Sequence, residues 1–292
     1  MPDPLPLRLG AHMSIAGGLE KAVERAKQAG CSVVQIFTKN NNQWRAKPLT
    51  DEGIELWRNA LVEYAITDPI AHASYLINLA SPNDELYRKS IDALVVEWQR
   101  AEQLGLDGLV VHPGAHTDST ESEGLARIGD AVREVIDRVE PKACRLLLEN
   151  TAGQGSCLGH SILHLSIMLQ AIDNPAAVGI CFDTCHALAS GYDLTTDEGF
   201  DELVSAIESE LPSSAIRALH LNDSKKPCGS RVDRHEHIGR GYVTLDGFRR
   251  VLKHPFFRDC PMYLETPKGT DPDTSKDWDV QNLEALRTLD LT

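Results

Sequence analysis

Eight short apolar segments recur along the chain, and a longer amphipathic stretch follows each of them. The segments are LRLGAH, VVQIFTK, PIAH, GLVVH, RLLLE, VGICFD, IRALH and PMYLE. The stretches carry apolar residues at spacings of three and four, which is typical of helices that cover a core, and they lie at about 17–30, 51–65, 83–105, 119–139, 159–172, 196–209, 244–254 and 274–288. A strand, a turn and a helix, repeated eight times, predict a (β/α)8 barrel, or TIM barrel, of the α/β class.

The length and composition fit one such barrel. A (β/α)8 barrel takes roughly 250 residues, so a chain of 292 residues leaves room for extended loops, and we expect a single domain over 1–292. With 42% hydrophobic and 25% charged residues the composition is that of an ordinary soluble globular protein. The chain shows neither a membrane-spanning stretch nor a signal peptide, so we expect a cytoplasmic protein with no membrane partner. The seven scattered cysteines suggest buried thiols rather than disulfides.

Each apolar segment ends on a residue that can bind a metal ion or a proton. These residues are His12, Lys39, His72, His112, Glu149, Asp183, His220 and Glu265. The carboxyl ends of all eight strands of such a barrel open on one face, so these side chains are expected to converge there. A single histidine is more often a packed core residue, but His72, His112 and Glu149 end three consecutive strands. A His/His/Glu set is a common catalytic zinc set when one position stays open for water.

More candidate ligands follow the sixth and seventh strands. Asp183 and His186 lie three residues apart in CFDTCHA, where a strand ends and turns. We reject a turn or cap role for Asp183, because the apolar segment before it would bury an unpaired acid. We keep that interpretation for Asp223 in LHLND, since short acids often satisfy free backbone amides in turns.

The segment DRHEHIGRG adds three alternating polar side chains. Asp233 and His235 are separated by one residue, a spacing that lets both side chains of an extended loop point the same way. His237 shares this spacing and therefore competes with His235 as a ligand.

The net charge argues against a nucleic-acid substrate. The chain holds 29 basic and 43 acidic residues, a net charge of −14, and on charge alone a small-molecule substrate is favoured. However, the acids concentrate on the predicted helices, whereas the loops TKNNNQWRAKP and SKKPCGSRVDRHEHIGRG are basic or uncharged. Several divalent ions on the face that these loops surround would make it positive while the molecule stays acidic.

Almost from end to end, the chain resembles the endonuclease IV family of apurinic/apyrimidinic (AP) endonucleases. GAHMSIAGGL, FTKNNNQWRA, HASYLINLA, HPGAH, ENTAGQGS, FDTCHA, SGYDL, HLNDSK, GSRVDRHEHIG and LETP occur in the family's order. The resemblance implies three zinc ions. Nine residues match the family's ligands: His72, His112 and Glu149 for the first ion; Glu149, Asp183, His220 and Glu265 for the second, with Glu149 as the bridge; and His186, Asp233 and His235 for the third.

The activity that the resemblance implies is hydrolysis of the phosphodiester bond 5′ to an abasic site in double-stranded DNA. The products are a 3′-hydroxyl and a 5′-deoxyribose phosphate, and 3′-blocked ends are expected to be trimmed as well. Two zinc ions can share a hydroxide, since zinc lowers the pKa of bound water from 15.7 to about 7. Glu149, as the bridge, and Glu265, as a ligand that also orients the hydroxide, are the candidate catalytic residues. Zn²⁺ is the expected cofactor, with Mn²⁺ an alternative at one site, in a monomer that acts at the nucleoid.

The resemblance places DNA contacts in the loops after the second and third strands. Tyr75 matches a side chain that enters the duplex at the lesion, where unstacking costs least because a base is missing. Asn42 stands where the family usually has an arginine, and Trp44 either stacks on a base or packs its loop. The remaining candidate DNA contacts are the basic side chains of these loops and of the loop after the seventh strand: Lys39, Arg45, Arg231 and Arg234.

Two other functions fit parts of the pattern. Xylose-isomerase-like barrels bind two divalent ions, so a sugar isomerase is the enzyme alternative. It predicts fewer histidine ligands and a catalytic lysine pair that the sequence lacks. The other alternative is a metal-loaded scaffold that binds DNA without cutting it, whose ligand shell would leave no position for water.

Overall fold

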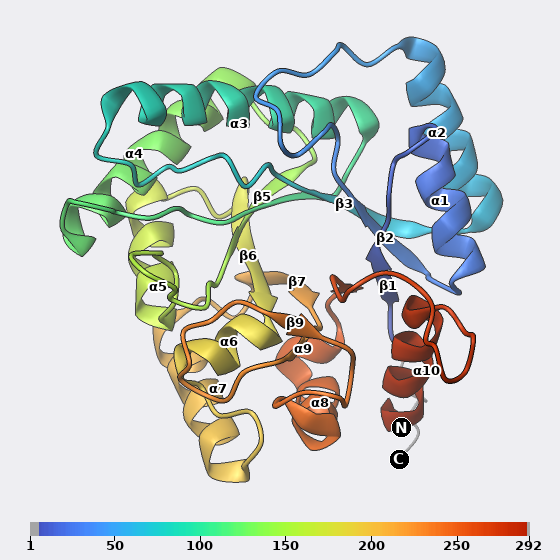
Figure 1. Ribbon diagram of the computed structural model, residues 1–292. Coiled ribbons are helices and arrows are strands. Elements are labelled where there is room, and N and C mark those ends of the chain that lie inside the picture. The colour runs from blue at the N-terminus through green and yellow to red at the C-terminus, as the bar shows by residue number, and fades with distance from the viewer. Residues whose placement is uncertain (1–5, 291–292) are drawn as a thin grey trace.

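Eight parallel strands form a closed barrel in the computed structural model, which describes residues 6–290 (Figure 1). Around the barrel the strands follow the order β1-β10-β7-β6-β5-β4-β3-β2. Their bounds are β1 Leu9–His12, β2 Val33–Ile36, β3 Thr67–His72, β4 Gly108–Val111, β5 Arg145–Glu149, β6 Val178–Asp183, β7 Ile216–His220 and β10 Met262–Leu264. The predicted (β/α)8 barrel is confirmed, although β2 ends at Ile36 rather than at the predicted Lys39.

The helices lie outside the strands and bury one face against them. All eight predicted helices occur, as α1 Leu19–Gln28, α2 Asp51–Tyr64, α3 Asp84–Leu104, α4 Glu121–Val139, α5 Ile162–Ile172, α7 Asp197–Glu210, α8 Thr244–Lys253 and α10 Trp278–Asp290. Elements that the sequence did not predict are α6 Thr184–Ser190, α9 Pro255–Arg258 and an antiparallel pair of short strands, β8 Asp223–Ser224 and β9 His235–Glu236. Within residues 6–290, none of these helices combines the length and the apolar character that crossing a membrane requires.

Polar side chains fix where several helices begin. Thr50, Asn83, Thr120, Ser161 and Thr196 each accept a hydrogen bond from the backbone N–H three residues later. Such a cap stabilises a helix by about 1 kcal/mol. The cap at Ser161 explains why α5 begins later than the predicted position 159.

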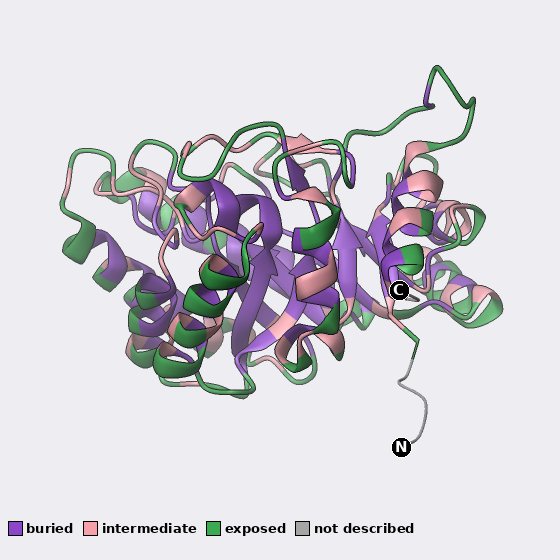
Figure 2. Cartoon of the chain, turned by 90° about the horizontal axis from the view of Figure 1, so that it is seen from below, coloured by how far each residue is buried: buried purple, intermediate pink, exposed green. Residues whose placement is uncertain are grey.

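An inner layer of apolar side chains fills the barrel. It consists of one residue from each of seven strands: Val33, Ile70, Val110, Leu147, Cys181, Ala218 and Tyr263. All are buried, and a larger apolar core lies between the strands and the helices, so that buried residues fill the centre of the molecule and exposed ones its outer faces (Figure 2). Each fully buried Val, Ile or Leu stabilises the fold by about 1.5–3 kcal/mol. The inner layer therefore supports the side chains at the carboxyl ends of the strands from below.

Candidate metal centre

The polar side chains at the mouth of the barrel follow directly from the inner layer. Side chains two positions apart on a strand face the same way, so the residue two positions after each member of the layer also points toward the barrel axis. These residues are Gln35, His72, His112, Glu149, Asp183, His220 and Glu265. In β1 the corresponding pair is Gly10 and His12, and Gly10 replaces an apolar residue because a Cβ there would lie 1.9 Å from the Val33 carbonyl oxygen.

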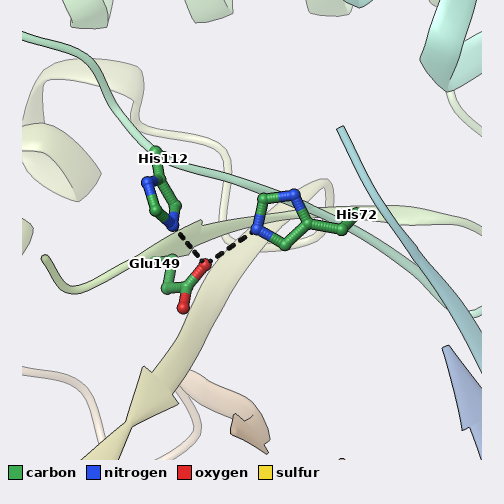
Figure 3. Close-up of side chains that lie close together, drawn as sticks. All are labelled: His72, His112 and Glu149. Atoms are coloured by element: carbon green, nitrogen blue, oxygen red, sulfur yellow. Dashed lines mark hydrogen bonds and ion pairs between the residues drawn. The ribbon is translucent and has the colours of Figure 1, made fainter. Parts of the chain in front are cut away.

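Glu149 lies at the centre of this polar layer, and its side chain is fully buried. Its Oε2 is 3.1 Å from Nε2 of His72 and 3.1 Å from Nε2 of His112, both of which point at the same oxygen (Figure 3). Its Oε1 is 2.8 Å from Nδ1 of His220 and 3.3 Å from Nδ1 of His186. The two oxygens thus face different sets of histidines, which is the arrangement that a carboxylate bridging two metal ions requires.

Two groups of possible ligands meet at Glu149. The ligand atoms of His72, His112 and Glu149 lie within 4.8 Å of one another, and so do those of Glu149, Asp183, His220 and Glu265. In the second group, Nδ1 of His220 is 3.3 Å from Oε2 of Glu265 and 3.9 Å from Oδ2 of Asp183. These are the residues that the resemblance to the endonuclease IV family implies for the first and second ions.

A third group lies beside the second. Its ligand atoms, from Asp183, His186 and His235, also lie within 4.8 Å of one another. Asp233 adds a second carboxylate, whose Oδ2 is 3.3 Å from Nε2 of His186 and whose Oδ1 is 3.3 Å from Nε2 of His235. Both of these nitrogens are buried without a hydrogen-bond partner among the described residues. Cys185 also borders this group, but burial raises the pKa of its thiol to about 12, so it stays protonated at neutral pH.

Four of the histidines each donate a hydrogen bond from one ring nitrogen to an oxygen outside the candidate ligand atoms. The pairs are His72 Nδ1 with Ala73 O at 2.7 Å, His186 Nδ1 with Asn150 O at 2.9 Å, His220 Nε2 with Gln35 Oε1 at 2.7 Å and His235 Nδ1 with Glu265 O at 3.2 Å. Each bond fixes a proton on that nitrogen and leaves the other ring nitrogen free to bind a metal, which in His186 is the Nε2 that faces Asp233.

The carboxylates and histidines of the cluster shift one another's pKa values. Burial acts to raise the pKa of Glu149, but the imidazoles of His220 and His112 outweigh it and hold that pKa well below its usual range. Burial acts to lower the pKa of His186, but Asp183 and the other nearby carboxylates raise it well above its usual range. The buried carboxylates therefore favour protonation of the histidines that face them. Divalent ions bound by the same nitrogens and oxygens would replace those protons, so the residues fit a metal centre.

Gln35 was not predicted from the sequence, yet it is fully buried among the candidate ligands. Its Nε2 donates to Oε1 of Glu265 at 2.6 Å and lies 2.9 Å from Nδ1 of His12, while its Oε1 accepts from His220. Asn222 was missed as well: its Nδ2 donates to Oδ2 of Asp183 at 2.6 Å and its Oδ1 accepts from the Glu265 N–H. The alternation from Val33 to Gln35 was the signal that would have found the first of them.

Three uncertain assignments are settled by hydrogen bonds and ring contacts. Asp183 does cap α6, since its Oδ1 accepts from the His186 N–H at 2.7 Å, so rejecting a cap role was wrong even though the side chain also faces the cluster. Asp223 lies in β8 rather than in a turn, but its carboxylate satisfies free backbone amides as expected, since it accepts N–H groups of the loop at 239–243. His237 stacks on Trp278 with ring centroids 3.8 Å apart, which leaves His235 to face the cluster.

The candidate DNA contacts divide into exposed and buried side chains. Tyr75 is 56% exposed and stands at the mouth, with its ring centroid 5.1 Å from that of His72 and 5.7 Å from that of His112. The other exposed candidates lie in the loops after β2 and β8: Asn42, Arg45, Arg231 and Arg234.

Lys39 and Trp44 differ from what the sequence predicted for a DNA surface. The Lys39 side chain is only 5% exposed, and its Nζ lies 3.1 Å from Oε1 of Glu97, so it is not placed to contact DNA. Trp44 is half-buried against the core with Nζ of Lys89 4.4 Å from its ring, which favours the loop-packing interpretation.

The chain is similar to known proteins along nearly its whole length. Residues 23–289 match the family described as xylose isomerase-like TIM barrel. The chain is 44% identical over 281 residues to a probable endonuclease 4 of Citrifermentans bemidjiense, covering 96% of this chain and 98% of the relative. It is 43% identical over 282 residues to a probable endonuclease 4 of Chloroflexus aurantiacus, covering 97% and 98%.

Solved structures agree with the sequence comparison. Endonuclease IV from Thermus thermophilus superposes with a TM-score of 0.84 at 33% identity, covering 97% of this chain and 98% of that one. A D-tagatose 3-epimerase-like protein superposes with a TM-score of 0.72, but its 20% identity shows the shared fold alone. On the strength of its fold, its polar layer and its full-length relatives, the chain belongs to the endonuclease IV family.

Proposed function

We propose that this protein is a zinc-dependent AP endonuclease. It hydrolyses the phosphodiester bond 5′ to an abasic site in double-stranded DNA, leaves a 3′-hydroxyl and a 5′-deoxyribose phosphate, and trims 3′-blocked ends at the same centre. The observation that carries the proposal is the fully buried Glu149 carboxylate, whose two oxygens face separate sets of histidines. A protein that binds a single ion has no need of such a bridge.

The nine candidate ligands would divide among three ions as the resemblance implies. His72, His112 and Glu149 would hold the first, and Glu149, Asp183, His220 and Glu265 the second. His186, Asp233 and His235 would hold the third, in a site bordered by Asp183. Bound divalent ions lower the pKa of water and stabilise negative charge on the phosphate and the departing 3′-oxygen. Zn²⁺ suits this donor set, and Mn²⁺ is the alternative at one site.

Two glutamates carry the chemistry that the protein itself supplies. Glu149 fixes the spacing of the first and second groups, because it belongs to both. Glu265 has one oxygen held by Gln35, and its side chain is 10% exposed at the mouth, where it can orient an attacking water molecule. No side chain has to act as the nucleophile.

The DNA duplex lies across the same face. Tyr75 enters the duplex at the lesion, Asn42 lies in the neighbouring loop, and the exposed Arg45, Arg231 and Arg234 contact phosphates. The enzyme acts as a monomer on the DNA of the nucleoid.

A sugar isomerase is the weaker alternative. Its support is limited to the shared barrel fold. The epimerase-like protein and the D-psicose 3-epimerase that superpose on this chain are only 20% and 16% identical to it. The five histidines that face the cluster exceed what that alternative predicts. A scaffold that binds DNA without cutting it is excluded if incision is observed.

One experiment tests the proposed function. A duplex with a single abasic analogue is incubated with the purified protein before and after prolonged chelation, and metal content is measured on the same samples. We expect incision on the 5′ side of the analogue, about three divalent ions per chain, and loss of both on chelation with recovery on zinc addition. One ion or none after metal-replete expression, or an intact abasic strand, would contradict the proposal.

A further inference from the structure

A buried ion pair joins the loop after β2 to helix α3. Nζ of Lys39 lies 3.1 Å from Oε1 of Glu97, and the two side chains are 5% and 1% exposed. Burying two charges is costly unless further hydrogen bonds satisfy them. Neither residue belongs to the metal cluster, so the pair needs another explanation.

Each partner of this pair holds the backbone of a different loop. The first recognition loop, 37–48, is bound by Lys39, whose Nζ donates to the Gln43 carbonyl oxygen at 2.6 Å. The second recognition loop, 73–83, is bound by Glu97, whose Oε2 accepts from the Ser74 N–H at 3.1 Å. The Ser74 hydroxyl in turn donates to the Asn41 carbonyl oxygen and connects the loops directly. These contacts lie next to Asn42 in one loop and Tyr75 in the other.

The helix behind the pair is well anchored. Arg100, also on α3 and buried, donates to the Lys47 carbonyl oxygen at 2.7 Å and to the Thr38 carbonyl oxygen, so it holds both ends of the first recognition loop. Trp98 fixes the helix to the barrel by donating to the Cys144 carbonyl oxygen at 3.0 Å. The two loops are thus held in position by contacts with the 21-residue helix α3 as well as by contacts with each other.

We infer that the Lys39–Glu97 ion pair sets the relative position of the two recognition loops, so that Tyr75 and Asn42 engage the same lesion. Lys39 and Glu97 are positioning residues, which touch neither DNA nor metal. This inference rests on the proposed function, because it assigns the two loops to lesion recognition. It makes the pair a determinant of specificity for abasic over intact DNA.

The test removes both charges together. The double variant Lys39→Met with Glu97→Gln nearly keeps the side-chain lengths and removes both charges of the pair together. The buried Arg100 keeps its hydrogen bonds to the Lys47 and Thr38 carbonyl oxygens, so the variant is expected to fold. Displacing a recognition group by about 1 Å can cost up to about 100-fold, and we expect abasic-duplex binding to weaken by about tenfold or more. Three other quantities should stay within about twofold of wild type: binding to intact duplex, zinc content and hydrolysis of the small diester bis(p-nitrophenyl) phosphate. KM for abasic duplex then rises while the metal chemistry is preserved.

Hydrogen–deuterium exchange supplies a readout that needs no DNA. Both recognition loops should exchange faster in the double variant, while β5 and β6 keep their protection. The matched control is Arg88→Met with Glu134→Gln, which removes a solvent-accessible ion pair at 2.6 Å between α3 and α4 and should change none of these quantities.

Several outcomes would overturn the inference. Wild-type discrimination between abasic and intact duplex in the double variant would do so, as would faster exchange in one loop only or in neither. An equal loss of zinc or of small-diester hydrolysis would assign the pair to the metal centre instead. Failure of the proposed function has a different signature, since the wild-type protein itself would then neither prefer nor incise abasic duplex.

Discussion

The metal cluster and the recognition loops occupy the same end of the barrel but are positioned in different ways. The cluster side chains lie at the ends of strands, where the alternation of inward and outward positions places them and the inner layer supports them from below. The recognition loops follow β2 and β3, and contacts from α3 hold them, although α3 lies more than 30 positions after the first loop. Local sequence therefore determines the chemistry of the site, whereas tertiary contacts determine how that chemistry meets its substrate.

The largest expected effect tests the centre of the cluster. Glu149→Gln keeps the shape of the side chain but removes the charge that serves two groups of ligands, so we expect incision of abasic duplex to fall by about 10³-fold or more. The barrel should stay folded because the residue lies at the catalytic mouth rather than in the apolar core. Steady-state kinetics and circular dichroism measure these two expectations, and metal content is determined on the same samples. Activity close to wild type would remove Glu149 from its central role.

A side chain of the cluster could be predicted from the sequence where the alternation along its own strand determines its position. His72, His112 and Glu149 were predictable because each ends, or directly follows, an apolar strand that pairs with the next. Gln35 was missed because the second apolar segment continues past the end of β2, so its end was assigned to Lys39. The chain leaves the barrel after Ile36, and this strand end is defined only by the pairing of β2 with β1 and β3.

The recognition loops were less predictable for a physical reason. A lysine in a polar loop is normally solvated, so nothing local indicated that Lys39 pairs with Glu97, which lies on a helix more than 50 positions later. In the same way, the half-buried position of Trp44 depends on the core and on Lys89 from α3. Such contacts link segments that are separated in the sequence, and hydrophobic periodicity carries no record of them.

The second prediction tests whether the cluster depends on more than its ligands. Gln35→Leu removes the donor to Glu265 and the acceptor for His220, so both ligands lose their fixed orientation. Losing such a partner typically weakens metal binding by about 10–100-fold. Competition with a chromogenic chelator measures the affinity, and Gln99→Leu, an exposed glutamine on α3, is the control. If the variant holds zinc as tightly as wild type, the strand-end residues alone define the centre.

The third prediction moves to the loops. Tyr75→Ala removes the exposed ring at the mouth, and stacking of this kind is worth about 1–3 kcal/mol. We expect abasic-duplex binding to weaken by about tenfold or more with zinc content unchanged, which would separate recognition from metal chemistry. Tyr75→Phe keeps the ring and should bind nearly as well as wild type. Equal losses in both variants would assign the effect to the hydroxyl group, and no loss in either would place lesion recognition in other loops.

The smallest expected effect concerns Asn42, which is exposed in the first recognition loop and whose N–H donates to Oδ1 of Asn40. An arginine offers length, a planar group and a charge that asparagine lacks, so Asn42→Arg should tighten abasic-duplex binding by a few-fold. One added phosphate contact should steepen the slope of log K against log salt by about 0.9. Asn42→Gln, which lengthens the side chain without charge, is the control.

The salt dependence distinguishes the two ways in which the Asn42→Arg substitution can act. A contact with phosphate alone changes the slope equally on abasic and intact duplex, because it carries no information about the lesion. Entry of the arginine into the gap left by the missing base tightens abasic duplex more than intact duplex at every salt concentration. An unchanged affinity and slope on both duplexes would mean that the loop held by Lys39 and Glu97 keeps position 42 away from DNA, and that Tyr75 reads the lesion from its side alone.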